Sequence, residues 1–195
     1  QYVLPPILAE FHKKFKDITV TLAINNTEQI EQALQNKTID FGIIEGHSKN
    51  VVFKYTEFVK DEIVLTANSQ NALAKKENWT LTELTKIPIL LREPGSGTLE
   101  VINHALKPSG IKISDFNIEM QLGSTESIKS YLSHSNCVAF LSTYSILKEL
   151  KNQEFTVLDV KDLAIERYFY FIQPHGELGT LPEVFMKFAR HYNFK

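Results

Sequence analysis

The sequence predicts an α/β fold built from two α/β units that are joined by two strands passing between them. Two observations lead to this prediction. Apolar runs alternate with amphipathic stretches along residues 2–44 and again along residues 87–160. A solitary apolar strand at 61–67 separates the two series, and another at 167–172 follows the second. Strands and helices that alternate at this spacing favour sheets with right-handed crossover connections.

The first unit opens with an amphipathic helix predicted over residues 2–15. Pro5 and Pro6 suit its first turn, where an N–H group would have no helical partner. Apolar residues recur at helical spacing and predict one buried stripe, formed by Ile7, Leu8, Phe11 and Phe15. Residues 18–24 then alternate between apolar and polar side chains, which predicts a strand.

Asn26 is placed to cap the next helix, because Gln29 follows three residues later as in a capping box. The apolar face of that helix would contain Ile30, Ala33 and Leu34. Residues 39–44 then form a short apolar run, which is typical of a strand buried on both faces of a parallel sheet.

The second series repeats this alternation over a longer stretch and ends in a final amphipathic helix that contains Phe185. In order, it predicts strand 87–91, helix 98–107, strand 118–122, helix 125–134, strand 138–141, helix 143–150, strand 155–160 and strand 167–172. The predicted division assigns residues 1–64 and 167–195 to one subdomain and residues 65–166 to the other. A cleft between two such lobes is a favoured place for a small ligand.

Charge and cysteine content exclude several classes of protein. Lys and Arg number 21 against 23 Asp and Glu, so the basic excess of a nucleic-acid-binding surface is absent. Cys137 is the single cysteine and lies in an apolar run, which indicates a buried structural thiol and excludes an internal disulfide. No apolar stretch approaches the ~18 residues of a membrane span. Since no signal peptide opens the chain, we expect a cytoplasmic location unless an export signal lies upstream.

The motifs of catalysis are missing from the sequence. The six histidines do not cluster at metal-ligand spacing, so neither a metal site nor a metal cofactor is expected. The chain has no Gly-x-Ser-x-Gly elbow, no dinucleotide fingerprint and no Walker A lysine. We therefore expect no catalytic residues, no cofactor and no enzymatic activity.

The candidate ligand site centres on residues 92–98, where a strand, a Gly-Ser-Gly turn and a helix follow one another. The first N–H groups of a helix bind small anions without a catalytic side chain. Ser96 and Thr98 add hydroxyl groups, while Gly95 and Gly97 permit a positive φ and a close approach to the ligand. The alternative is that Ser96 or Thr98 only caps the helix, a role worth ~1 kcal/mol.

Ser124 and Thr125 repeat this arrangement at the start of the next predicted helix. Glu126 already places a negative charge near the positive end of that helix, which suits a capping role. Ser124 is suited to both capping and ligand binding.

A third helix start, at Asn26 and Thr27, lies in the other predicted lobe. Glu45 ends the strand at 39–44, and open parallel sheets bind ligands beyond the carboxyl ends of their strands. A carboxylate there would accept hydrogen bonds from the ammonium group of an amino-acid-like ligand. The alternative is a solvated loop acid.

The order and spacing of these motifs resemble the effector-binding domain of LysR-type transcriptional regulators over nearly the whole chain. The motifs are Leu4–Pro5, Asn26–Thr27, 39–46, 61–65, 92–98 and 124–129. The resemblance implies the type 2 periplasmic-binding-protein fold, with two Rossmann-like α/β subdomains joined by two crossover strands. It also implies that a small anionic or zwitterionic metabolite binds in the cleft and controls transcription. The pattern is most similar to the branch of cysteine and sulfur-assimilation regulators.

The resemblance further implies a homodimer or higher homo-oligomer, with the exposed side of residues 5–16 as the candidate contact. DNA would be bound only through an N-terminal helix-turn-helix that this chain does not contain, and no membrane partner is implied. Two features depart from the family. The strand and Ser/Thr-bearing turn that open the family domain are missing, so completion of the first sheet is an open question. Leu99 also stands where relatives often carry Arg, which leaves Arg92 as the nearest candidate cation.

Two alternatives stay open at this point. An exported solute-binding protein of a transporter shares the fold and would carry a signal peptide or lipid-anchor cysteine upstream. An enzyme on the same fold would show an ionisable pair with strongly shifted pKa values in the cleft, where Glu45 is the single candidate.

Overall fold

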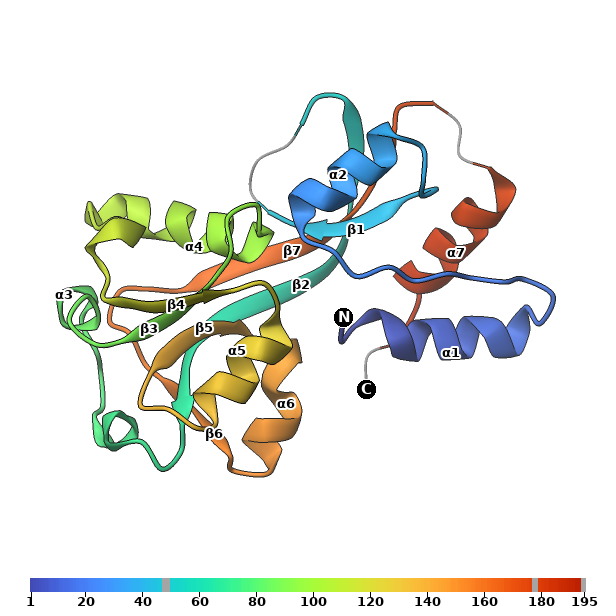
Figure 1. Ribbon diagram of the computed structural model, residues 1–195. Helices are drawn as coiled ribbons and strands as arrows, with labels where there is room; N and C mark the ends of the chain where they lie inside the picture. Colours follow the sequence, from blue (N-terminus) through green and yellow to red (C-terminus); the bar gives the residue numbers. More distant parts are fainter. Residues whose placement is uncertain (47–49, 177–178, 194–195) are drawn as a thin grey trace. The chain divides into compact units, whose positions relative to one another are not determined.

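The computed structural model describes residues 1–46, 50–176 and 179–193 (Figure 1). The chain divides into two compact units and crosses between them twice. Unit 1 contains Gln1–Val59 and Tyr168–Lys195, and unit 2 contains Lys60–Arg167.

Each unit combines helices with part of a β-sheet. Unit 1 has helices α1 (Leu4–Lys14), α2 (Thr27–Gln35) and α7 (Thr180–Arg190) and strand β1 (Gly42–Glu45). Unit 2 has helices α3 (Leu81–Leu84), α4 (Gly97–Leu106), α5 (Thr125–Leu132) and α6 (Thr143–Lys151). Its strands are β3 (Ile89–Arg92), β4 (Ile118–Leu122), β5 (Val138–Ser142) and β6 (Phe155–Leu158). Strands β2 (Phe53–Asn68) and β7 (Ile165–Pro174) run from one unit into the other.

In unit 2 the strand order is β6-β2-β5-β3-β4. Strand β2 is antiparallel to both β5 and β6, whereas β3 is parallel to both β4 and β5. The three parallel strands therefore end at the same edge of the sheet, where the loops that lead into α4, α5 and α6 begin.

The core of unit 2 lies on both faces of this sheet, with α4 on one face and α5 and α6 on the other (Figure 1). Strand β3 shows why. Ile89 and Leu91 pack on the α4 side, while Leu90 packs on the side of α5 and α6. All three residues are at most 2 % exposed, so the continuous apolar run is explained by burial on both faces.

Unit 1 is held by two apolar contacts. Ile30 and Leu34 of α2 pack on β1, β2 and β7 through Ile44, Phe53 and Ile172. Helices α1 and α7 meet through aromatic rings, with the Phe11 ring 5.1 Å from that of Phe185 and 5.3 Å from that of Phe188.

The predicted helices and most of the predicted strands are confirmed within a few residues. Pro5 lies in the first turn of α1, and Ile7 and Phe11 are its buried residues. The strand predicted at 39–44 is present, but the parallel pairing and the burial on both faces that its apolar run suggested are wrong. Strand β1 pairs antiparallel with β7, and its residues alternate between buried and partly buried.

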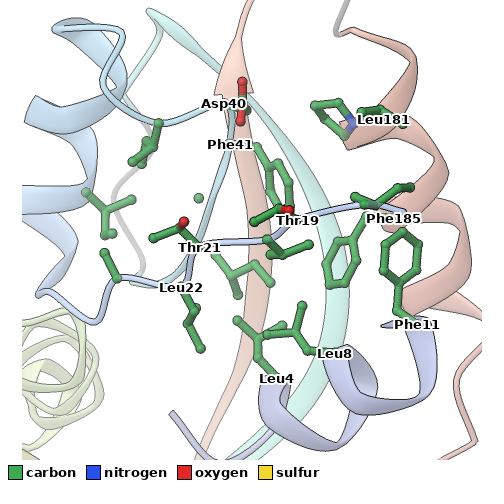
Figure 2. Close-up of a pocket in the computed structure, with 18 of the residues that line it drawn as sticks. Leu4, Leu8, Phe11, Thr19, Thr21, Leu22, Asp40, Phe41, Leu181 and Phe185 are labelled. Atoms are coloured by element: carbon green, nitrogen blue, oxygen red, sulfur yellow. The ribbon is translucent and has the colours of Figure 1, made fainter. Parts of the chain in front are cut away.

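The strand predicted at residues 18–24 is also wrong. This segment pairs with no strand among the described residues, and Val20, Leu22 and Ile24 are 49, 41 and 60 % exposed. A segment with alternating apolar and polar residues forms a strand only where a neighbouring strand supplies hydrogen-bond partners for its backbone. A groove of about 480 Å³ instead lies between this segment, residues 38–43 and helices α1 and α7 (Figure 2).

Substitution of two leucines in unit 1 tests this description of residues 18–24. Leu34 is 1 % exposed, and Leu34→Ala should lower the free energy of unfolding by about 2–5 kcal/mol because it leaves a cavity. Leu22 is 41 % exposed, and Leu22→Ala should cost less than about 1 kcal/mol. Urea unfolding of both variants measures the difference. Equal losses would show that residues 18–24 pack as a buried strand.

Candidate functional site

The site in unit 2 begins with the parallel pairing of β3 and β4. Arg92, the last residue of β3, is in register with Leu122, the last residue of β4. Helix α4 starts five residues after β3, and α5 starts three residues after β4. The N-terminal turns of the two helices are therefore brought to the same edge of the sheet.

The turn before α4 depends on one glycine. Gly95 has a φ of +84°, a conformation that residues with a Cβ seldom adopt. Its neighbour Ser96 donates its main-chain N–H to the carbonyl of Glu93 at 3.2 Å, which closes the turn. Gly97 is not in the positive-φ region, so that part of the prediction is wrong. Gly97 is instead the first residue of α4 and is buried.

Ser96 occupies the position before α4 where a serine hydroxyl normally caps a helix. Here it makes no capping hydrogen bond. The residue is 4 % exposed, and its Oγ has no hydrogen-bond partner among the residues that the structure describes. A buried hydroxyl left unpaired costs about 1–3 kcal/mol. The purely capping interpretation therefore does not explain Ser96, and a ligand oxygen that accepts from this hydroxyl would remove the cost.

Thr98 lies in the first turn of α4 and contacts a buried ion pair. Arg167 donates from Nη1 to the Thr98 hydroxyl at 3.0 Å and from Nε to Asp61 Oδ2 at 2.7 Å. The other carboxylate oxygen of Asp61 accepts from the hydroxyls of Ser142 at 2.9 Å and Thr143 at 3.3 Å. The side chains of the pair are 3 % (Arg167) and 0 % (Asp61) exposed. Each charge is thus compensated inside unit 2.

Arg92, the candidate cation, is also paired. Its guanidinium donates to both carboxylate oxygens of Glu93, at 2.8 and 3.0 Å, and to the hydroxyl of Thr125 at 3.4 Å. The contact with Thr125 joins the loop before α4 to the first turn of α5. Arg92 therefore links the two helix starts, while Glu93 balances most of its charge.

Ser124 caps α5 in the ordinary way. Its Oγ accepts from the main-chain N–H of Ser127 at 3.1 Å and lies 2.8 Å from the Ser127 hydroxyl. Glu126 lies in the first turn of α5 and forms an ion pair with Lys129 at 3.1 Å. The two helix starts therefore differ, because the hydroxyl at the start of α5 serves the helix and the hydroxyl at the start of α4 does not.

The predicted residues of unit 1 are near one another. Asn26 and Gln29 form the expected capping box at the start of α2, with hydrogen bonds of 3.0 and 3.1 Å. Thr27 donates its hydroxyl to the main-chain carbonyl of Glu45 at 2.8 Å. This bond holds the start of α2 against the end of β1, so the three predicted residues of unit 1 lie together.

Sequence reasoning missed Asp61 and Arg167 as neighbours of the site. Each lies in or beside an apolar strand, where a charge requires a partner. That signal was visible in the sequence, but it did not indicate which residues would be paired. Asp61 and Arg167 are 106 positions apart along the chain.

The described residues give little support to a reactive cysteine or to a metal site. Cys137 is 4 % exposed, and burial raises the pKa of its thiol, which favours the unreactive protonated form. In the three described ranges, His, Cys, Asp and Glu form no group of three or more that would suit a metal ion. No described helix combines the length and the apolar character needed to cross a membrane.

The α/β fold is one that this chain shares with periplasmic-binding-protein structures, such as a phosphate transporter substrate-binding protein of Clostridium perfringens, which is 15 % identical with a TM-score of 0.77. The family model of the LysR substrate binding domain matches residues 1–193, and the chain belongs to that family. It is therefore a LysR substrate binding domain, and the relatives that it matches are transcriptional regulators. The chain is 28 % identical over 189 residues to the transcriptional activator CmpR of Synechocystis and 26 % identical over 187 residues to the regulator CysL of Bacillus subtilis.

Those alignments include 96 and 95 % of this chain but only 61 and 62 % of the two relatives. The chain thus spans about three fifths of their length. Among solved structures, the CcmR regulatory domain of Synechocystis in complex with 2-PG is 27 % identical, with a TM-score of 0.86. That comparison covers 97 % of this chain and 90 % of the CcmR chain. The relatives do not settle the branch of the family, although CysL is similar to this chain.

A pair of serine substitutions tests the different roles of the two hydroxyls. Ser124→Ala removes a cap and should lower the free energy of unfolding by ~1 kcal/mol. Ser96→Ala removes an unpaired buried hydroxyl and should leave that free energy unchanged or slightly raise it. Chemical unfolding without ligand measures both. A loss of stability in Ser96→Ala that equals the loss in Ser124→Ala would show that Ser96 acts only as a cap.

Proposed function

We propose that this chain binds a small metabolite at the first turns of α4 and α5 and thereby controls the transcription factor to which it belongs. The observation that carries the proposal is the buried hydroxyl of Ser96 at the start of a ten-residue helix, for which no described residue supplies a hydrogen-bond partner. The N–H groups of that first turn and the helix dipole favour an anionic group. A carboxylate, sulfate or similar group would accept from Ser96 Oγ and from these amides.

The charges around the site favour a ligand of low net charge. Arg167 is paired with Asp61, and Arg92 is paired with Glu93. Leu99, which directly follows the Gly-Ser-Gly-Thr turn, adds no cation. A ligand with several negative charges would meet few uncompensated cations, so we infer a monoanionic or zwitterionic effector.

The residues of unit 1 stay predicted ligand contacts. Asn26 and Thr27 place a second helix start next to Glu45. The Glu45 carboxylate would suit the ammonium group of a zwitterion, and this is why amino-acid derivatives are among the effectors to test.

For the whole protein we propose more than the binding of a metabolite by this domain. We infer a cytoplasmic regulator that pairs with a second copy through the exposed side of residues 5–16 and binds DNA through an N-terminal helix-turn-helix. The rival is an exported solute-binding protein with the same fold. About 90 codons upstream of Gln1 would encode a helix-turn-helix in the first case and a signal peptide or lipid-anchor cysteine in the second.

Calorimetric titration tests the binding site. The ligands are a panel of sulfur metabolites, amino-acid derivatives and 2-PG, the compound in the complex of the CcmR regulatory domain. At least one ligand should bind, and Ser96→Ala and Thr98→Val should each weaken its affinity about tenfold or more, because a hydrogen bond to a charged group is worth ~1.5–3 kcal/mol. Monoanionic and zwitterionic ligands should bind more tightly than multiply charged ones of the same size.

Ser130→Ala is the matched control, because Ser130 is exposed on α5, away from its first turn. Its affinities should equal those of the unsubstituted chain. Affinities that stay unchanged in Ser96→Ala and Thr98→Val would place the site elsewhere, and tighter binding of the multiply charged ligands would contradict the inferred effector class.

A further inference from the structure

Asp61 and Arg167 have a special position along the chain. Strands β2 and β7 are the two connections between the units, and they are neighbours in the sheet. Unit 1 ends at Val59 on β2 and resumes at Tyr168 on β7. Asp61 is therefore the second residue of unit 2, and Arg167 is the last. Their ion pair joins the two connecting strands within unit 2, at the points where these strands leave it.

The same guanidinium also contacts the proposed ligand site. Arg167 uses Nε for Asp61, at 2.7 Å, and Nη1 for the hydroxyl of Thr98, at 3.0 Å. A guanidinium is planar, and its donors are fixed relative to one another. The position of Thr98 is thus tied to that of Asp61 through one rigid group, with no flexible side chain in between.

The direction of the hydrogen bonds gives this connection a chemical consequence. The Thr98 oxygen accepts from Arg167 at 3.0 Å, and in the proposed complex the same hydroxyl donates to an oxygen of the effector. A hydroxyl that donates to an anion becomes a better acceptor, because hydrogen bonds in a chain polarise one another. Binding of an anionic group at Thr98 would therefore strengthen the contact with Arg167.

Asp61 connects Arg167 to the end of β5 and the start of α6. Its Oδ1 accepts from Ser142 at the end of β5 and from Thr143 at the start of α6. Burial raises the pKa of the neighbouring Tyr144, and the Asp61 charge adds to that rise. The carboxylate is held from two directions, so a shift of Arg167 cannot be absorbed by free rotation of Asp61.

We propose that Arg167 is a positioning residue that presents the Thr98 hydroxyl to the effector and transmits its occupancy to strands β2 and β7. This inference rests on the proposed function for the existence of an effector. The connection from Asp61 through Arg167 to Thr98 does not depend on a ligand. Arg167 does not touch the effector in this scheme. It acts through Thr98 on one side and through Asp61 on the other.

Arg167→Lys is the central variant. Lysine keeps the positive charge beside Asp61, so the buried carboxylate is not left unpaired. Its single ammonium group does not reproduce the guanidinium fork that spans Asp61 and Thr98. The exposed pair Lys60–Glu166, 2.9 Å apart, provides the matched control, because Lys60→Gln with Glu166→Gln removes another charge pair next to the first without touching Thr98.

The first measurement needs no ligand. Amide hydrogen exchange in Arg167→Lys should be at least about fivefold faster at residues 100–102, the first amides of α4 with helical partners, while the control should match the unsubstituted chain there. Thr98→Val should also speed exchange in residues 60–62 and 165–168, and Thr98→Ser, which keeps the hydroxyl, should not. Unchanged exchange at residues 100–102 in Arg167→Lys, or equal changes in Thr98→Val and Thr98→Ser, would overturn the positioning role.

The second measurement uses the tightest ligand of the calorimetric panel. Arg167→Lys should weaken it about tenfold, and the double variant with Thr98→Val should be no weaker than Thr98→Val alone, since both substitutions remove one connection. Additive losses would show that Arg167 acts on the ligand by another route. If no ligand binds the unsubstituted chain, the proposed function fails, and the exchange experiment still decides the role of Arg167.

Discussion

The parallel pairing of β3 with β4 is the constraint on which the candidate site depends. Parallel strands end at the same edge of a sheet, so the helices that follow them begin side by side. In unit 2 this places the starts of α4 and α5 together, and Arg92 joins them by its bond to Thr125. Ile89 and Leu91 pack on one face of β3 and Leu90 packs on the other, so a shift by one residue would move each side chain into the core cluster of the opposite face.

A second constraint is that buried charges require partners. The structure meets it within unit 2, where Arg167 faces Asp61 and Arg92 faces Glu93. The result is a candidate site with little excess charge, in which amide groups and hydroxyls are the proposed means of recognition. The unpaired hydroxyl of Ser96 differs from this pattern, and it is the feature of the site that points to a ligand.

Local sequence signals predicted most of the elements because their causes are local. The capping box of Asn26 and Gln29 depends on a spacing of three residues, and the structure contains both of its hydrogen bonds. The run at 87–91 indicated burial through its continuous apolar character. Residues 18–24 show the limit of such reasoning, because their alternation is that of a strand but no described strand pairs with them.

By itself, the sequence determined the α/β class, the order of the elements, the family and the glycine-containing turn before α4. These follow from spacing, side-chain size and backbone freedom, which act between residues near one another in the chain. Only the tertiary structure decided that β1 is antiparallel to β7, that Ser96 does not cap α4 and that Arg167 joins Asp61 to Thr98. Each of these depends on which distant segments become neighbours. Packing and the pairing of buried polar groups determine which segments become neighbours, and neither can be derived from a single segment of the chain.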